Sequence, residues 1–159
     1  SMRLKSNFLL YLTSSDLDKN QYLSLFLTAW NMFVENTFLG VGPNNFRLSC
    51  QEDLFNISIW SCSTHPHSLT FQLLAEIGIL GFLIVVYVLL FFSFQSLKLA
   101  QKKVLSFKDF GFFSITVSLI IYLFPLMITG NFFLSWYGYI YYLPISLFII
   151  YKKETDLLN

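Results

Sequence analysis

Residues 110–151 contain no charged side chain, and this uncharged stretch limits the possible folds more than any other feature of the sequence. Its 42 residues are about twice the ~20 that an α-helix needs to cross a bilayer. A turn at Gly130–Asn131 divides the stretch into helices over residues 110–129 and 137–151. A second uncharged run, residues 77–97, has 21 residues and the length of one span. The sequence therefore predicts three transmembrane helices.

The composition also indicates a membrane protein built from α-helices. Hydrophobic residues make up 55% of the 159 residues and charged residues 12%, whereas soluble domains have roughly 45–50% apolar and about 25% charged residues. The chain is therefore predicted to be an all-α, polytopic membrane protein in contact with membrane lipid. Its formal net charge of +1 provides no basic field, which argues against nucleic acid as a partner.

Lysines follow the first and third predicted spans and set the orientation of the chain. They are Lys98, Lys102, Lys103, Lys108, Lys152 and Lys153. By the positive-inside rule, the loop at residues 98–109 and the tail at residues 152–159 belong in the cytoplasm. Residues 1–76 and the turn at residues 130–136 are then predicted to be extracytoplasmic.

Residues 21–34 have the spacing of an amphipathic helix. The apolar side chains that recur at helical spacing are Leu23, Phe26, Leu27, Trp30, Phe33 and Val34. Ser24, Thr28 and Asn31 form a polar face. The run spans roughly 21 Å, which is too short to cross a bilayer. We expect this helix to lie along the membrane surface or to pack with its apolar face against its own protein.

A polar, turn-rich segment follows at residues 36–66. Gly40 and Gly42 favour a tight turn with positive φ, which would present Asn44 and Arg47 beside the membrane. Two glycines at this spacing also occur in the dinucleotide-binding fingerprint, but its third glycine and its βαβ unit are absent, so that interpretation is rejected. An ordinary surface arginine whose aliphatic stem lies on the membrane is the alternative for Arg47.

Cys50 and Cys62 are the only cysteines, and both lie in this loop. On an oxidising outer side we expect them to form a disulfide, which would restrict the unfolded chain by roughly 3 kcal/mol and hold Arg47 near His67. Zinc is the alternative, because His65 and His67 add two further ligands. The Cys-x11-Cys-x2-His-x-His spacing matches no common structural zinc pattern, so no metal site is predicted.

Both histidines of the chain flank Pro66, just before the first predicted span. Proline suits the first helical turn, so the helix is expected to begin near residues 64–66 and to place His67 in or beside that turn. A histidine beside an apolar helix is usually structural. Two histidines that flank a proline at a membrane surface raise the odds of a functional role.

Continued helical spacing predicts how the following side chains are arranged. His67, Phe71, Leu74, Gly78 and Gly81 fall along one stripe. Glu76 lies about 180° from His67 and is expected to pair with a residue of a neighbouring helix. Gly78 and Gly81 are expected to permit close approach of helices. All three residues are therefore assigned structural roles.

Four segments together carry a family resemblance: Ala29–Phe33, Gly40–Arg47, His65–Ser68 and Glu76–Gly81. They resemble the large extracytoplasmic loop and the following helix of the O-antigen ligase and O-antigen polymerase family, over roughly residues 22–97. The order of the histidine motif after a Gly-Val-Gly-Pro loop makes the likeness specific.

The resemblance implies a membrane glycosyltransferase on the outer, periplasmic face of the bacterial inner membrane. Its donor would be a polyprenyl-diphosphate-linked glycan, and its acceptor a hydroxyl of the lipid A core or of a growing polysaccharide. His67 matches the family's proposed catalytic histidine, and Arg47 matches an arginine that binds the diphosphate. His65 is given a lesser part, in binding diphosphate or shaping the loop, and Gly40 and Gly42 a structural one. No metal or other cofactor is implied.

Two features depart from the family. Tyr22 stands about where an arginine is often found upstream of the Ala-Trp helix. Members of the family have some ten or more spans, whereas this chain shows three. We therefore expect one of two situations: either the chain is the C-terminal part of a longer protein, whose remaining transmembrane helices would be its partners, or its activity needs something that is supplied elsewhere.

Two other classes of function fit parts of the sequence. A transporter would usually place ionisable residues within its spans, but residues 77–97 and 110–151 contain no charged residue. A non-catalytic membrane scaffold that binds a partner protein is the remaining alternative, because every motif residue can fold without reacting.

Overall fold

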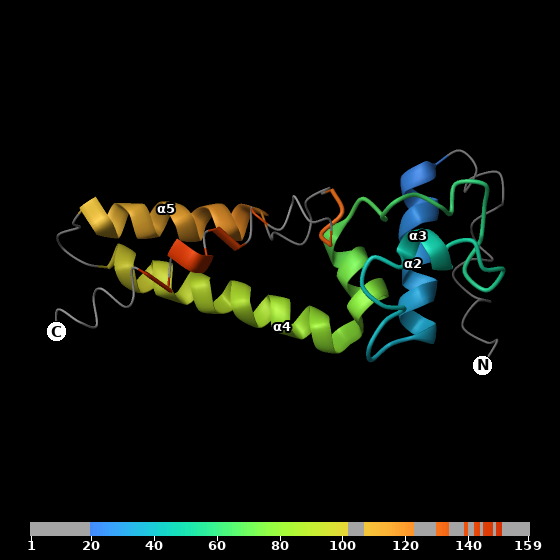
Figure 1. The fold of residues 1–159 in the computed structure, drawn as a ribbon, viewed down its shortest axis with the longest axis horizontal. Helices are drawn as coiled ribbons and strands as arrows, with labels where there is room; N and C mark the ends of the chain where they lie inside the picture. Colours follow the sequence, from blue (N-terminus) through green and yellow to red (C-terminus); the bar gives the residue numbers. More distant parts are fainter. Residues whose placement is uncertain are drawn as a thin grey trace.

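The computed structural model describes residues 20–101, 107–122 and 130–133 and, beyond them, 139, 142, 143, 145–147, 149 and 150. Within these residues all regular structure is helical, and none is a β-strand. The labelled helices are α2 (Gln21–Glu35), the single turn α3 (Phe46–Ser49), α4 (Leu69–Ala100) and α5 (Phe107–Tyr122). Figure 1 shows α2 and α3 at one end of α4, with α5 alongside its other end. The all-α prediction is therefore confirmed for the described part of the chain.

Helix α2 is capped by Asn20, whose side chain accepts a hydrogen bond of 3.1 Å from the Leu23 N–H. Its buried face differs from the predicted one. The buried residues are Ser24, Leu25, Leu27, Thr28, Ala29 and Met32. Ser24 and Thr28 are short enough to let α2 approach α4 closely, whereas Trp30 is 45% exposed. Of the predicted apolar face only Leu27 is buried, so the face that packs against the protein coincides with the predicted apolar face only in part.

One hydrophobic cluster joins α2, α3 and the first part of α4. Its buried members are Leu25, Ala29, Met32, Phe46, Cys50, Phe55 and Ala75. Val41 and Phe71 are partly buried and pack against it. The segment between α2 and α4 therefore has its own core, which holds its turns in place.

Helix α4 is interrupted at Gly78, whose φ of 64° and ψ of −169° are not helical. In Figure 1 the first segment of α4 runs beside α2, and after a bend the longer segment runs away along α5. Four backbone hydrogen bonds of 2.8–3.4 Å join the bend to the preceding loop: Ile79 N–H to Thr37 O, Leu80 N–H to Phe38 O, Val41 N–H to Ala75 O and Gly42 N–H to Glu76 O. These bonds provide partners for backbone N–H and C=O groups that the break in the helix would otherwise leave without a hydrogen bond.

The segment that approaches Gly78 is a loop rather than the helix that the sequence predicted. A Cβ atom at Gly78 would collide with the backbone of Phe38 and Leu39. A Cβ atom at Gly40 would lie 2.6 Å from the carbonyl oxygen of Ala75. The two glycines therefore let two backbones lie against each other at the bend.

The predicted stripe does not continue through the bend. His67 precedes α4, and the non-helical Gly78 changes the angle at which the later residues project. Gly81 accommodates the side chain of Ile77 from its own helix, where the sequence predicted approach by another helix.

One helix among the described residues, Leu69–Gln95 within α4, is long and apolar enough to cross a membrane. It begins before the first predicted span, residues 77–97. After the bend, about 22 residues rise roughly 33 Å, the thickness of a bilayer core. Helix α5 is described over 16 residues, whereas residues 123–129 and parts of 137–151 lie outside the described residues. The second and third spans therefore stay predictions.

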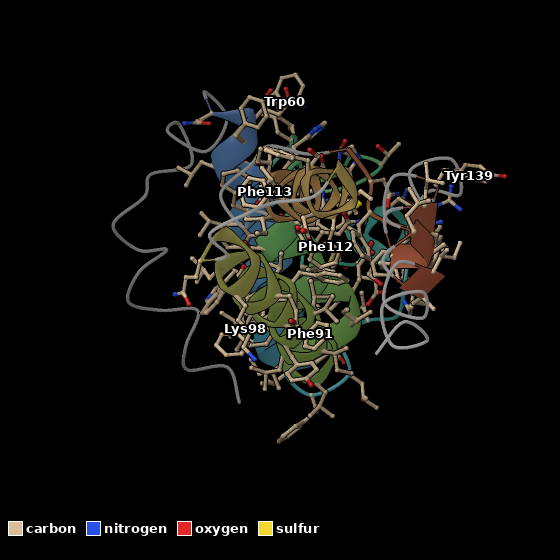
Figure 2. The ribbon with its side chains drawn as sticks, turned by 90° about the vertical axis from the view of Figure 1, so that its left-hand side faces the viewer. Trp60, Phe91, Lys98, Phe112, Phe113 and Tyr139 are labelled. Carbon is tan, nitrogen blue, oxygen red and sulfur yellow. A yellow bond between two sulfur atoms is a disulfide. The ribbon has the colours of Figure 1, made fainter. Side chains whose placement is uncertain are left out.

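Helix α5 packs along the longer segment of α4. Phe92 and Phe112 are buried in this contact, and the side chains packed against them include Val88, Phe91 and Ile145. Figure 2, which looks along the molecule, shows Phe112 directed from α5 toward α4. The helix pair forms an apolar hairpin.

The turn at residues 130–133 lies beside the start of α4 (Figure 1). Phe132 and Phe133 pack against the cluster of Leu69 and Leu73. Two segments that the sequence assigned to the same membrane face, this turn and the loop after α2, therefore meet at one end of the molecule.

Candidate functional site

The loop that carries Arg47 is fastened to α4 by one carboxyl group. Glu76 is fully buried and accepts hydrogen bonds from the backbone N–H groups of Asn44 at 3.0 Å and Phe46 at 2.9 Å. Gln72 Nε2 donates a third bond of 3.2 Å. Every one of these neighbours donates, so the carboxyl group acts as an acceptor. The sequence predicted that Glu76 would pair with a residue of a neighbouring helix. In the structure this partner is the backbone N–H of Phe46, the first residue of α3.

A chain of side-chain amides extends from Glu76 to the turn at residues 130–133. Its bonds are Gln72 Nε2 to Asn131 Oδ1 at 2.7 Å, Phe132 N–H to Gln72 Oε1 at 3.0 Å, Asn131 Nδ2 to Asn44 Oδ1 at 2.8 Å and Asn131 Nδ2 to Thr64 O at 3.5 Å. Gln72 and Asn131 are both buried. The network joins α4, the turn and both segments that carry predicted site residues.

Cys50 and Cys62 are joined as a disulfide. Cys50 is buried in the hydrophobic cluster beside α2, and Cys62 is exposed. Because both sulfur atoms are in the disulfide, neither can act as the thiolate ligand that a zinc site would need. No group of three or more His, Cys, Asp or Glu side chains in the described residues is placed to hold a metal ion.

The two histidines lie against each other just before α4. His65 is buried, with its Nδ1 2.9 Å from Thr64 Oγ1. His67 is partly exposed, and its ring centroid lies 4.2 Å from that of His65. His67 Nε2 is 3.4 Å from Ser63 Oγ, and the Tyr22 ring of α2 meets the His67 ring edge-on at 5.9 Å. His67 is thus the histidine that is accessible to a ligand.

Helix α4 begins at Leu69, so the predicted start near residues 64–66 was wrong. His67 has a φ of 57°, which a right-handed helix does not contain. The Ser68 carbonyl accepts the Gln72 N–H at 2.9 Å and so makes the first helical bond. His67 is therefore held in a turn just before the helix.

Arg47 lies in α3, and its side chain is exposed. Within the described part of the chain, the guanidinium group forms no hydrogen bond or ion pair, either with His67 or with another side chain. The structure connects the segments that carry Arg47 and His67 through the disulfide and through Asn131.

An apolar cavity of about 360 Å³ lies on the predicted apolar face of α2. It is lined by Leu23, Phe26, Leu27, Trp30 and Phe71. The rings of Phe26 and Phe71 stack at 4.9 Å, and Tyr22 lies 6.4 Å from Phe26. A line of aromatic rings therefore runs from this cavity to His67.

Comparison with protein families decides which class of protein this arrangement belongs to. The family model described as O-antigen ligase matches residues 5–86, half of the chain. The chain belongs to the O-antigen ligase family. Membership places it among membrane-associated, glycosyltransferase-like enzymes of lipopolysaccharide and polysaccharide biosynthesis that act on glycans and lipid-linked substrates. No curated protein and no solved structure matched the chain.

The family match contains α2, the loop and the histidine turn, but it ends within α4, before Asn131. Sequence reasoning did not single out Gln72 as a site residue, and it assigned Asn131 only to a turn. The sequence does contain one signal for both residues, which is that each is an amide next to a long apolar run. An amide is costly to bury unless it has hydrogen-bond partners, so such a residue is a candidate for a buried polar contact. That signal marks a polar contact but does not identify its partner.

Proposed function

We propose that this chain carries the catalytic loop of an enzyme that transfers a glycan from a polyprenyl diphosphate to an acceptor hydroxyl. The acceptor belongs to the lipid A core or to a growing polysaccharide, and the site faces the outer side of the bacterial inner membrane. Family membership supports a lipid-linked glycan substrate. The catalytic role is assigned to His67 on one observation, namely that its side chain is partly exposed in a turn of positive φ just before α4.

The backbone of His67 has a conformation that residues other than glycine rarely adopt. A left-handed residue with a side chain costs about 1–2 kcal/mol, and the φ of His67 is 57°. Pro66 and Leu69, both fully buried, anchor the turn on either side. Backbone strain that the surroundings maintain is typical of functional sites.

In the proposed reaction His67 acts as the general base. Its imidazole takes the proton of the acceptor hydroxyl while the acceptor oxygen forms a bond to the anomeric carbon of the donor sugar. The bond between that carbon and the diphosphate oxygen breaks, and polyprenyl diphosphate leaves with the electron pair. A positioned base typically contributes about 10²–10⁴-fold to the rate. Ser63, 3.4 Å from Nε2, helps to orient the ring.

Arg47 is proposed to bind the diphosphate as it leaves. Its exposed guanidinium group has forked donors that match phosphate oxygens, and its positive charge offsets the negative charge that grows on the leaving group. The backbone of this segment is held by Glu76 through Asn44 and Phe46, so the position of α3 is fixed. His65, buried beside Thr64, is given the role of supporting His67. These steps need acid–base and electrostatic chemistry alone, without a cofactor.

The test is a transfer assay with the purified full-length protein in liposomes, with a polyprenyl-diphosphate-linked glycan as donor and a metal chelator present. Lipid A core and a preformed polysaccharide are offered as acceptors in separate reactions. We expect one glycosylated acceptor and an equal amount of polyprenyl diphosphate. The acceptor that reacts distinguishes a ligase from a polymerase. Absence of transfer to both acceptors by folded protein would favour the scaffold alternative.

A further inference from the structure

The turn at residues 130–133 lies beside the start of α4 (Figure 1). One buried amide of this turn, that of Asn131, bonds to both parts of the proposed site. Asn131 is 6% exposed. Its Nδ2 donates to Asn44 Oδ1 at 2.8 Å and to the Thr64 carbonyl at 3.5 Å, across 87 and 67 positions of the chain. Asn44 belongs to the segment of Arg47, and Thr64 belongs to the turn of His67. A single side chain therefore contacts both segments.

The backbone groups that contact the side-chain amides of Asn131 and Gln72 determine which atom of each amide is the oxygen and which is the nitrogen. The Phe133 N–H donates to Asn131 Oδ1 at 3.0 Å, and a backbone N–H can only donate, so this atom is the oxygen. The Thr64 carbonyl can only accept, so the atom that faces it is the nitrogen. Gln72 is oriented in the same way, because its Oε1 accepts from the Phe132 N–H. Asn131 thus uses both ends of its amide, and the arrangement has one consistent assignment.

We propose that Asn131 is a positioning residue of the active site, which holds the Arg47 segment and the His67 turn in a fixed mutual arrangement. The inference rests on the proposed function. The disulfide joins the same two segments at a different point. A single connection lets two segments rotate about it in several directions, whereas a second connection restricts that rotation. Misplacement of a reacting group by about 1 Å can lower a rate by about 10²-fold.

The test compares Asn131→Ala and Asn131→Asp with the parent in the full-length protein. Asn131→Asp keeps an acceptor for Gln72 and Phe133 but loses both donated bonds. We expect kcat per folded enzyme to fall roughly 10–100-fold in both variants, with the disulfide content at the parental level. Asn56→Ala, which removes an exposed asparagine of the same loop, is the matched control and should keep the parental kcat.

A double-mutant cycle tests whether Asn131 acts through Asn44. Asn44→Gly removes the amide and suits the φ of 60° at this position. If the contact is the cause, Asn131→Ala should lower kcat less in the Asn44→Gly background than in the parent. Equal effects in both backgrounds would remove Asn44 from the proposal and count against it.

Failure of this inference can be distinguished from failure of the proposed function. If the parent transfers glycan and Asn131→Ala keeps the parental kcat, the positioning role is wrong and the proposed function stands. The same conclusion follows if the loss is explained entirely by a lower yield of folded protein. If the parent itself does not transfer, the proposed function fails, and the inference fails with it.

Discussion

Gly78 and Gly40 face each other across the bend of α4 and the loop before α3. Their φ values are 64° and 67°, and a Cβ atom on either would meet backbone atoms of the other segment. Backbone atoms cannot rotate away as the end of a side chain can. A side chain at either position would therefore push the two segments apart and strain the four hydrogen bonds between them.

Gly78→Ala is expected to destabilise the protein. The backbone of Gly78, with φ 64° and ψ −169°, lies in a region that is essentially restricted to glycine and costs another residue about 1–3 kcal/mol, and the collision with Phe38 adds to this cost. Gly111→Ala is the control, because a Cβ atom there meets open space within α5 and should stabilise the helix by roughly 0.5–1 kcal/mol. Thermal unfolding of both variants in detergent measures the difference. Equal stability would mean that α4 is not broken at Gly78.

Glu76→Gln is expected to lower stability more than the specific rate. A glutamine has one oxygen, so its NH₂ group would face the N–H of Asn44 or Phe46 and leave it unpaired, at a cost of about 1–3 kcal/mol. Glu35→Gln, at the exposed end of α2, is the control. The yield of folded protein and the transfer rate per folded enzyme are measured together. Parental stability with lost transfer would instead give Glu76 a chemical role.

At the scale of elements, the sequence predicted the extent of α2 well, residues 21–34 against the observed Gln21–Glu35, because helical periodicity is a local signal. The buried face of α2 was not predictable, since burial follows from how closely α4 approaches. The bend at Gly78 was missed for a similar reason. A glycine within an apolar run reads as part of a continuous helix, and its left-handed φ is maintained by the distant loop at residues 37–42.

The Cys50–Cys62 disulfide should be present in the protein isolated without reductant. It closes the loop after α3 and, in the loop-entropy model, restricts the unfolded chain by roughly 3 kcal/mol. Mass spectrometry of the non-reduced protein should show a mass lower by two hydrogens than that of the reduced form. Two free thiols, or zinc that copurifies in equal amount, would be the contrary result.

At the scale of the whole molecule, the sequence predicted an all-α membrane protein from the length of its uncharged stretches and from its composition. The sequence could also indicate candidate site residues that lie close together in the chain, such as His65 and His67. It could not predict the contact of Asn131 with Asn44 or that of Tyr22 with His67, because each joins segments far apart in the chain. The packing of residues 130–133 on α4 agrees with the lysine pattern, which assigns this turn and the loop to one side.

The orientation in the membrane is tested by cysteine labelling in intact cells. Cysteine in place of Ser106 should be shielded from impermeant thiol reagents, and cysteine in place of Asn56 should react. The physical reason is the positive-inside rule, which keeps the lysine-rich loop in the cytoplasm. The opposite labelling pattern would remove the loop from the outer face and with it the proposed site.

The transfer rate of purified, full-length His67→Ala protein tests the central claim most directly. We expect the rate to fall about 10²–10⁴-fold, because the general base is lost, while the folded yield stays at the parental level. Arg47→Lys should also be severe, since a point charge cannot replace forked donors, and Asn56→Ala should be harmless. A parental rate in His67→Ala, with Arg47→Lys equally harmless, would contradict the account and favour a non-catalytic scaffold.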